Sequence, residues 1–294
     1  MKSLWKLLLS VLLIHSNLFS QPINEFAAKS YLRTGNSDGY ISPFIDVVGS
    51  SMNSSGFSYL YDSIQKFHIY VGLNVTSAFI PGSMQSFNGV TEEPFSPEIT
   101  VTNAPTVFGN NSALTAVDQT GDNYVFPGGF GINLVNLLFP SLQIGNFFNT
   151  NLSFRFLALD FGGDLKSIKL FGGGIQHFIS PYWGAKDYFV GVGASFNQIK
   201  IGEYLTGNNI LAQINAGQQK GIFNYYGFAA YQNNKYEFFY ADEENGDGSV
   251  VYEGDQPIRF GLGGGIQLWK FYLHAEASGF KPVVASVGFG LRFK

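Results

Sequence analysis

The chain contains no cysteine, and only 13% of its 294 residues are charged. The missing cysteine excludes disulfide bonds, thiolate metal sites, a cysteine nucleophile and attachment as a lipoprotein. The charge content is about half of the roughly 25% that is typical of soluble domains. This composition argues against a water-soluble enzyme, and the net charge of −4 disfavours nucleic-acid binding.

The mean hydropathy is only +0.07, which argues against a bundle of apolar membrane helices. Residues 123–154 carry no charge, but they contain Pro127, Pro140, several glycines and several asparagines. These residues break or weaken a helix, and asparagine is costly at mid-bilayer depth. We therefore predict one or two strands there instead of a spanning helix.

The first 20 residues predict a secretory signal peptide. Lys2 and Lys6 form a basic start, residues 7–14 form an apolar core, and we expect cleavage after Ser20. The alternative is a membrane anchor, which needs about 20 apolar residues. The signal directs the chain out of the cytoplasm.

Apolar residues recur at every second position along most of the chain, which places them on one face of a strand. At the C-terminus the apolar positions are Ala285, Val287, Phe289, Leu291 and Phe293. Segments 67–76, 258–268 and 271–278 repeat the pattern, and the total is about eleven runs. Bacterial outer-membrane barrels have an even number of strands, so we predict about 12, with 10 or 14 as alternatives.

The composition of the second face separates a membrane barrel from a secreted sandwich. That face contains glycine, serine, asparagine and tyrosine with few charges, as expected for a barrel lumen. The fold class predicted is therefore all-β, a closed antiparallel transmembrane barrel. Two runs lose their phase, at Gly172–Gly174 and between Phe196 and Ile199, and we expect β-bulges there.

Three segments do not follow the strand pattern. Residues 21–65 are predicted to be a partly helical plug or periplasmic segment, with a short helix over 43–49, and a loosely ordered extension is the alternative. Residues 66–294 form the barrel. Residues 82–123 and 242–255 are expected to be long extracellular loops.

Several motifs resemble an uncharacterised family of outer-membrane barrels from Bacteroidota-type bacteria, distantly similar to long-chain fatty-acid channels. They are residues 78–81, the run 139–145 leading to Thr150 and Arg155, and residues 172–177. The last two strands are also similar. The resemblance implies a barrel with an N-terminal plug that passes or holds hydrophobic molecules.

Strand parity places a set of ionisable residues in the lumen, because a charge on the lipid side costs roughly 2 to 4 kcal/mol near the midplane. The set is His68, Arg155, Lys169, Arg259, His274, Glu276 and Arg292. These residues either pair across the lumen to fix barrel closure, or bind the anionic head of an amphipathic ligand. Lys169 apart, they are our candidate ligand-binding residues.

An enzyme is not expected. His177 or His274 could pair with Ser195, Ser278 or Ser286 in a lumenal lipid hydrolase, but no nucleophile-elbow motif surrounds these serines. We predict no metal site, because the histidines have no paired-ligand spacing, and we predict no cofactor.

The sequence thus predicts a bacterial outer-membrane protein that passes hydrophobic or amphipathic small molecules. Its expected partners are membrane lipids, lipopolysaccharide and fatty-acid-like molecules, with no nucleic acid. The alternatives are a structural or surface-interaction barrel without transport, and the lumenal hydrolase.

Overall fold

The computed structural model describes residues 34–57, 67–93, 95–117, 119, 121, 123–162, 166–185, 187–240 and 248–293. The predicted signal peptide lies outside the described residues. Parts of the predicted 21–65 segment and of the 242–255 loop also lie outside them.

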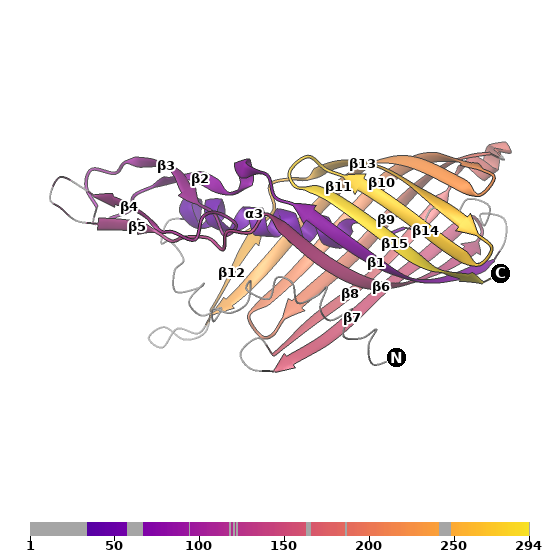
Figure 1. Ribbon diagram of the computed structural model, residues 1–294, viewed down its shortest axis with the longest axis horizontal. Helices are drawn as coiled ribbons and strands as arrows, with labels where there is room; N and C mark the ends of the chain where they lie inside the picture. The colour runs from indigo at the N-terminus through magenta and orange to yellow at the C-terminus, as the bar shows by residue number, and fades with distance from the viewer. Residues whose placement is uncertain are drawn as a thin grey trace.

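Ten antiparallel strands form a closed ring (Figure 1). They are β1 (His68–Phe79), β6 (Leu134–Phe147), β7 (Thr150–Gly162), β8 (Lys166–Phe178), β9 (Tyr188–Ile201), β10 (Leu205–Lys220), β11 (Phe223–Tyr240), β13 (Ile258–Leu268), β14 (Phe271–Ser278) and β15 (Val283–Phe293). The ring closes because β1 pairs with both β6 and β15. β12 (Gly248–Glu253) pairs with the same edge of β11 as β13 does, further along the strand.

The preferred strand number of about 12 was therefore wrong, and the ring has ten, the lower of the two alternatives. The pattern treats 222–232 and 235–241 as two strands, whereas β11 is one strand of 18 residues. Its outward side chains are apolar up to Tyr231, and its apolar Tyr236 then points inward. When the apolar residues change from one face to the other within a strand, the sequence pattern resembles a break between two strands.

One end of the barrel carries a lobe between β1 and β6. The lobe contains η3 (Gly82–Met84), β2 (Ser86–Val90), β3 (Thr100–Pro105), β4 (Leu114–Val117) and β5 (Asn123–Phe126). The predicted 82–123 loop was thus only partly right, because this region forms two hairpins, β2–β3 and β4–β5. Figure 1 shows the lobe projecting beyond the ring, while the C-terminus lies at the other end.

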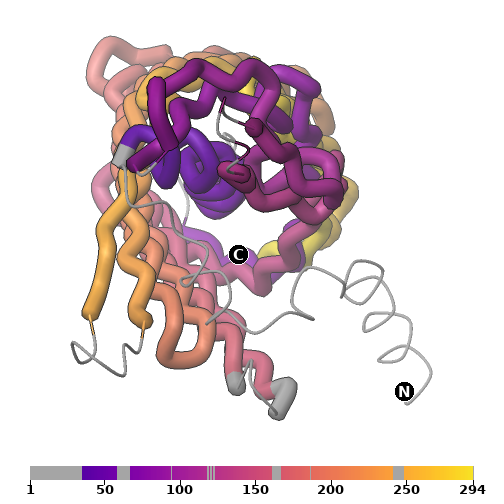
Figure 2. Tube along the Cα trace, turned by 90° about the vertical axis from the view of Figure 1, so that its left-hand side faces the viewer, coloured from indigo at the N-terminus to yellow at the C-terminus, as the bar shows by residue number. Residues whose placement is uncertain are grey.

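A helix, α3 (Thr34–Asn53), lies inside the ring (Figure 2). It includes the predicted short helix at 43–49 but begins nine residues earlier. Its sequence contains three glycines and an internal Pro43, residues that weaken helices. Packing inside the barrel therefore stabilises α3 more than intrinsic propensity does.

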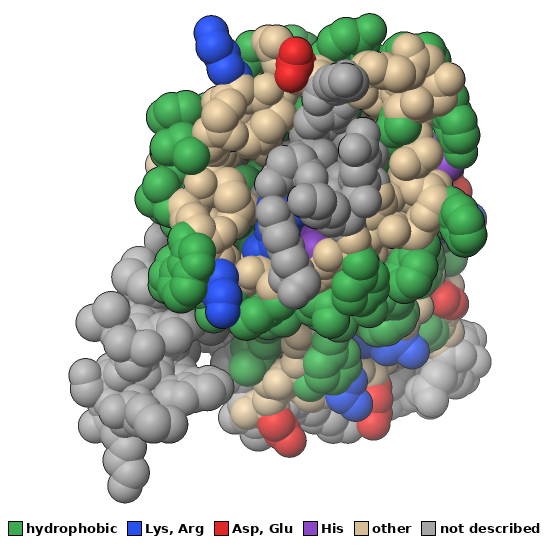
Figure 3. Space-filling view, turned by 90° about the vertical axis from the view of Figure 1, so that its right-hand side faces the viewer, with side chains coloured by type: hydrophobic (Ala, Val, Ile, Leu, Met, Phe, Trp, Pro, Cys, Tyr) green, Lys and Arg blue, Asp and Glu red, His purple; other side chains and the backbone are tan. Residues whose placement is uncertain are grey.

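The two faces of the strands have the predicted orientation near the C-terminus. Phe289 is 57% exposed and Leu291 38% exposed on the outside, whereas Arg292 is 2% exposed on the inside. Figure 3 shows hydrophobic side chains around the rim at this end. The outer surface is apolar where the lumen is polar.

The polarity of the faces is reversed towards the lobe end of β8 to β11. On β9, Phe196 is exposed on the outside, but Ile199 and Ile201 are buried on the inside and Lys200 is exposed. Lys169 is likewise exposed on the outside of β8, directly opposite Lys200. The prediction that Lys169 faces the lumen was wrong, because it lies where the outer surface has become polar.

This reversal also explains the two apparent losses of phase. β8 and β9 pair in continuous register through 172–174 and 196–199, so the predicted bulges are absent there. Gly172 faces inward, and a Cβ at this position would lie 2.2 Å from Oδ1 of Asn197. Its role is to admit a neighbouring side chain. Separately, no helix in the described part of the chain is long and apolar enough to cross a membrane.

Candidate functional site

The candidate site is the inner surface of the barrel together with α3, which occupies it. One face of α3 presents apolar residues at helical spacing, namely Ile41, Ile45, Val48 and Met52. They pack against the inward side chains of the reversed region, which are Leu170, Ile199, Ile201, Leu205 and Tyr236, and also against Phe139 and Tyr252. This half of the contact resembles the core of a soluble protein.

A second face of α3 is attached to the lobe. Nδ2 of Asn36 donates to the carbonyl of Val90 at 2.6 Å, and the N–H of Val90 donates to Oδ1 of Asn36 at 2.9 Å. The hydroxyl of Tyr40 donates to the carbonyl of Gly128 at 3.0 Å. Helix and lobe therefore form one unit at this end.

Two arginines hold the C-terminal end of α3. Arg155 donates to the carbonyls of Met52 at 2.9 Å and Ser54 at 2.6 Å. Arg259 donates to the carbonyl of Ser50 at 2.7 Å and to the hydroxyl of Ser54. The last carbonyls of a helix lack partners within the helix and carry partial negative charge, so guanidinium groups are suited to this position.

A carboxylate completes this contact. Oε1 of Glu276 accepts a hydrogen bond from the N–H of Ser55 at 3.2 Å and lies 4.0 Å from Nη2 of Arg259. Arg155, Arg259 and Glu276 are all more than 90% buried. Arg259 and Glu276 thus pair between the neighbouring strands β13 and β14 and not across the lumen, and both contact the end of the helix.

Amide side chains extend the polar contact around the helix end. Nδ2 of Asn53 donates to Oε1 of Gln232 at 3.3 Å and to Oδ1 of Asn234 at 3.2 Å. Oδ1 of Asn53 accepts from Nδ2 of Asn197 at 3.2 Å. Nε2 of Gln232 donates to the hydroxyl of Ser50 at 3.0 Å. The contact between the C-terminal end of α3 and the barrel wall is therefore made of hydrogen bonds.

The other three candidate residues lie inside the ring and make their hydrogen bonds or strand pairing with other residues of the wall. His274 shares a hydrogen bond of 3.0 Å with Oδ1 of Asn74, and His68 lies 3.5 Å from Nε2 of Gln143. Arg292 is opposite Tyr70 in the β1–β15 register. A cavity of about 10 Å³ near His274 and Arg155 has room for about one water molecule. Ligand binding by the six residues stays a prediction.

The histidine–serine pairs of the hydrolase alternative are not formed among the described residues. His177 faces outward and contacts Thr150 at 2.9 Å and Tyr182 at 3.2 Å. Neither His177 nor His274 hydrogen-bonds to Ser195, Ser278 or Ser286 in the described part of the chain. That part also contains no group of three or more histidine, aspartate or glutamate residues able to hold a metal ion.

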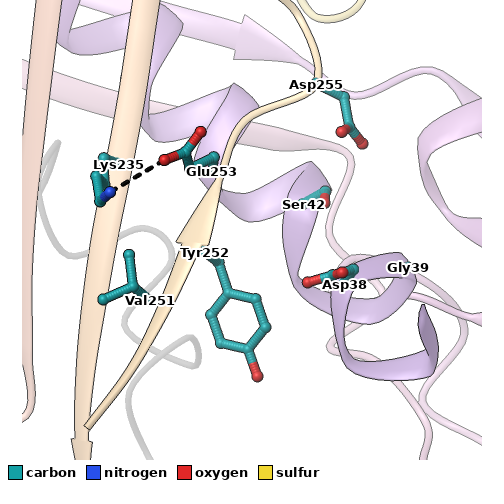
Figure 4. A pocket seen from close by; sticks show the side chains of 8 residues that line it. All are labelled: Asp38, Gly39, Ser42, Lys235, Val251, Tyr252, Glu253 and Asp255. Carbon is teal, nitrogen blue, oxygen red and sulfur yellow. Dashed lines mark hydrogen bonds and ion pairs between the residues drawn. The ribbon is translucent and has the colours of Figure 1, made fainter. Parts of the chain in front are cut away.

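A larger cavity of about 520 Å³ opens at the lobe end, between α3 and β12 (Figure 4). Asp38 and Asp255 lie at this cavity, and Nζ of Lys235 pairs with Oε1 of Glu253 at 3.1 Å. Burial and the charge of Asp255 both raise the pKa of Asp38. The lining is mostly polar and carries three acids beside Val251 and Tyr252, so it is poorly suited to a lipid tail.

Behind this cavity, α3 contacts a break in the wall. β12 ends at Glu253 and β13 begins at Ile258. Oδ1 of Asp46 accepts from the N–H of Gln256 at 3.1 Å, and Nε2 of Gln232 donates to the carbonyl of Gln256 at 2.8 Å. The helix thus supplies a partner for the N–H of Gln256, while Gln232 of β11 supplies one for its carbonyl.

Asp46, Ser50, Ser54 and Gln232 were not among the predicted site residues. The serine-rich run after Met52 and the acid inside an apolar helix were visible signals of a helix end in polar surroundings. Their partners lie up to 210 positions away in the chain. Periodicity within one segment gives no access to such contacts.

A family model of unknown function, DUF6588, matches residues 1–293. The chain belongs to this family. No curated protein matches the sequence. The Bacteroidota part of the resemblance remains untested.

Solved structures with similarity to this member of DUF6588 include outer-membrane barrels. The N-terminal barrel domain of OprF from Pseudomonas aeruginosa is 16% identical, with a TM-score of 0.28, and covers 52% of this chain and 97% of its own. A FadL homologue from P. aeruginosa is 8% identical, with a TM-score of 0.25, and covers 84% and 96%. The translocator domain of NalP from Neisseria meningitidis is 11% identical, with a TM-score of 0.30, and covers 89% and 100%.

Proposed function

We propose that this protein resides in a bacterial outer membrane and that α3 closes a passage for amphipathic small molecules with an anionic head. The membrane location is supported by the apolar outer band. On β10, Ile210 and Ile214 are more than half exposed, and on β15 so are Val287 and Phe289. Such a surface is stable against hydrocarbon and costly against water.

The observation that carries the passage is the match between α3 and the inner wall. α3 presents apolar side chains to the apolar inner wall near the lobe end. At its C-terminal end it presents carbonyl oxygens to two arginines. An amphipathic acid offers the same two features in the same order along the barrel axis. Such a molecule would therefore compete with α3 for this surface.

The arginines give the proposal its chemical selectivity. If α3 left, Arg155 and Arg259 would lose their carbonyl acceptors, and the nearby carboxylate of Glu276 would balance only one of the two charges. A guanidinium binds a carboxylate with two parallel hydrogen bonds. Neutral or cationic amphiphiles would gain no such contact.

The test is mass spectrometry of small molecules that remain bound after purification in mild detergent. We expect the wild-type protein incubated with oleate to retain it, and the Arg155→Gln/Arg259→Gln variant to retain at least about tenfold less, since a lost charged hydrogen bond is worth roughly 1.5 to 3 kcal/mol. Lys220→Gln, at an exposed turn, is the control. Equal retention of oleate by the double variant would refute the proposal.

A second candidate is a surface-interaction barrel whose lumen stays closed. It is favoured by the lobe, which is fixed to α3 and projects from the ring (Figure 1). Deleting the lobe would then abolish binding to a partner without altering solute uptake. We expect lipids and lipopolysaccharide to surround the barrel in either case.

A further inference from the structure

We propose that α3 is a proton-controlled plug, held in the barrel when Asp46 is protonated and released more readily when Asp46 is ionised. This inference concerns regulation and rests on the proposed function only in treating α3 as the closing element. It begins from the contact between Asp46 and the wall break at residues 254–257.

The position of Asp46 is unusual for a carboxylate. It is 3% exposed in the middle of α3, between the apolar residues Ile45 and Val47, which are fully buried. A Cβ added to Gly254 would lie 2.5 Å from its Oδ1, so the carboxylate fits closely against the wall. An ionised carboxylate in such a place loses its hydration.

The groups around Asp46 do not supply a positive charge. Its hydrogen bond comes from the neutral N–H of Gln256, and the charge that acts on it is another acid, Asp255. Asp38 lies two turns earlier on α3, and Tyr236 approaches from β11. Lys235 forms its ion pair with Glu253 of β12 and not with Asp46.

These surroundings determine the sign of the pH effect. Burial raises the pKa of Asp46 to about 7, the charge of Asp255 adds to the rise, and hydrogen bonds from the backbone of Gln256 and Asp255 oppose it. The docked helix therefore binds the proton more tightly than a solvated helix does. Docking should weaken as pH rises from about 4 to about 7, and change little above that range.

The wall segment that Asp46 contacts borders the acidic cavity, because Asp255 lines it next to Gln256. The cavity of about 520 Å³ lies on the solvent side of the same segment, with Asp38 and Asp255 on its wall (Figure 4). Arg155 and Arg259 contact backbone carbonyls at the C-terminal end of α3. The titrating contact thus lies in the middle of α3, about one turn before Ser50.

Because the native chain has no cysteine, a single introduced thiol can report on the helix. Ser51 is fully buried on α3, and its hydroxyl donates only within the helix, to the carbonyl of Val47. We would measure labelling of Ser51→Cys in detergent-purified full-length protein at pH 5 and pH 8. Each rate would be divided by that of Ser112→Cys, an exposed lobe position, to remove the pH dependence of the thiol.

We expect the normalised labelling rate to rise roughly 10- to 100-fold from pH 5 to pH 8, because up to two pH units separate pH 5 from the docked pKa. Asp46→Asn in the same background should show no such rise. Asp255→Asn should retain the rise with its midpoint at lower pH. A flat wild-type profile would overturn the proposal, and so would a pH-dependent Asp46→Asn profile.

Two controls keep the outcomes separate. Heat-dependent gel mobility establishes that each variant keeps a folded barrel, and Asp255→Asn provides the decisive profile if Asp46→Asn fails this check: an unchanged midpoint in Asp255→Asn would then refute the proposal. Labelling reports movement of α3 without any ligand. A pH-dependent plug that retains no oleate would refute the proposed passage and leave this inference standing.

Discussion

Gly49 is the residue at which α3 approaches the barrel wall closely enough to exclude a side chain. A Cβ at this position would lie 2.3 Å from Cγ of Asn234 on β11. Gly35, in the first turn of the same helix, has no atom within 4 Å of the corresponding point. The two glycines therefore differ in function although the sequence presents them alike.

We predict that Gly49→Val destabilises the protein by about 1 to 3 kcal/mol through overpacking against Asn234. Helix propensity favours valine over glycine by a few tenths of a kcal/mol, so a loss would come from the clash. Thermal unfolding in detergent measures the change. Gly35→Val should be neutral, and Asn234→Ala should restore part of the loss; equal effects of the two glycine substitutions would contradict this explanation.

At the scale of the strand, the outward-facing residues of β10 change from apolar to polar along its length. Ile210 and Ile214 are exposed on that face, and Asn208 follows them towards the lobe end. Asn208 shares a hydrogen bond of 2.8 Å with Gln198 of β9. The boundary of the membrane should therefore lie between Ile210 and Asn208.

We predict that Ile214→Lys costs about 2 to 4 kcal/mol of folding free energy in phospholipid vesicles, because it places a charge in hydrocarbon. Asn208→Lys, on the same face of the same strand, should cost less than about 1 kcal/mol. Folding titrations with urea measure both values. Equal costs would place the boundary elsewhere.

Strand identity and orientation were predictable where one face stays in one solvent. The alternation at Phe289, Leu291 and Arg292 fixes β15 correctly. It misled at β11 and at Lys169, because those strands exchange their apolar and polar faces towards the lobe end. Alternation in a sequence records which face is apolar and does not record which solvent it meets.

The candidate site was predictable only in part. Parity placed Arg155, Arg259 and Glu276 inside the barrel, where the structure has them. Their principal partners, Ser50 and Met52 in α3 and Ser55 just after it, could not be inferred, because these contacts join segments from distant parts of the chain. The short helix predicted at 43–49 gave no indication that it ends against these charges.

At the scale of the molecule, the two ends of the barrel differ. The lobe and β12 lie at one end, and the other end carries the C-terminus and two-residue turns such as Gly221–Ile222 and Trp269–Lys270. Outer-membrane barrels have short periplasmic turns and longer extracellular loops. The lobe should therefore face the outside of the cell.

We predict that a membrane-impermeant thiol reagent labels Ser112→Cys on intact cells and fails to label Lys220→Cys until the outer membrane is permeabilised. Ser112 lies in the lobe, and Lys220 is exposed beside a short turn. Labelling is read from gels of the whole-cell protein. The reverse pattern would invert the orientation.

The pairing of β1 with β15 joins the first and last strands of the ring. This seam can form only after β15 has been synthesised, whereas α3 precedes every strand in the described part of the chain. The helix must therefore already lie between the strands when the seam forms, unless it is threaded in afterwards. Assembly of the wall and sealing of its interior would then be a single event, so a newly made molecule never exposes the membrane to an unobstructed hole.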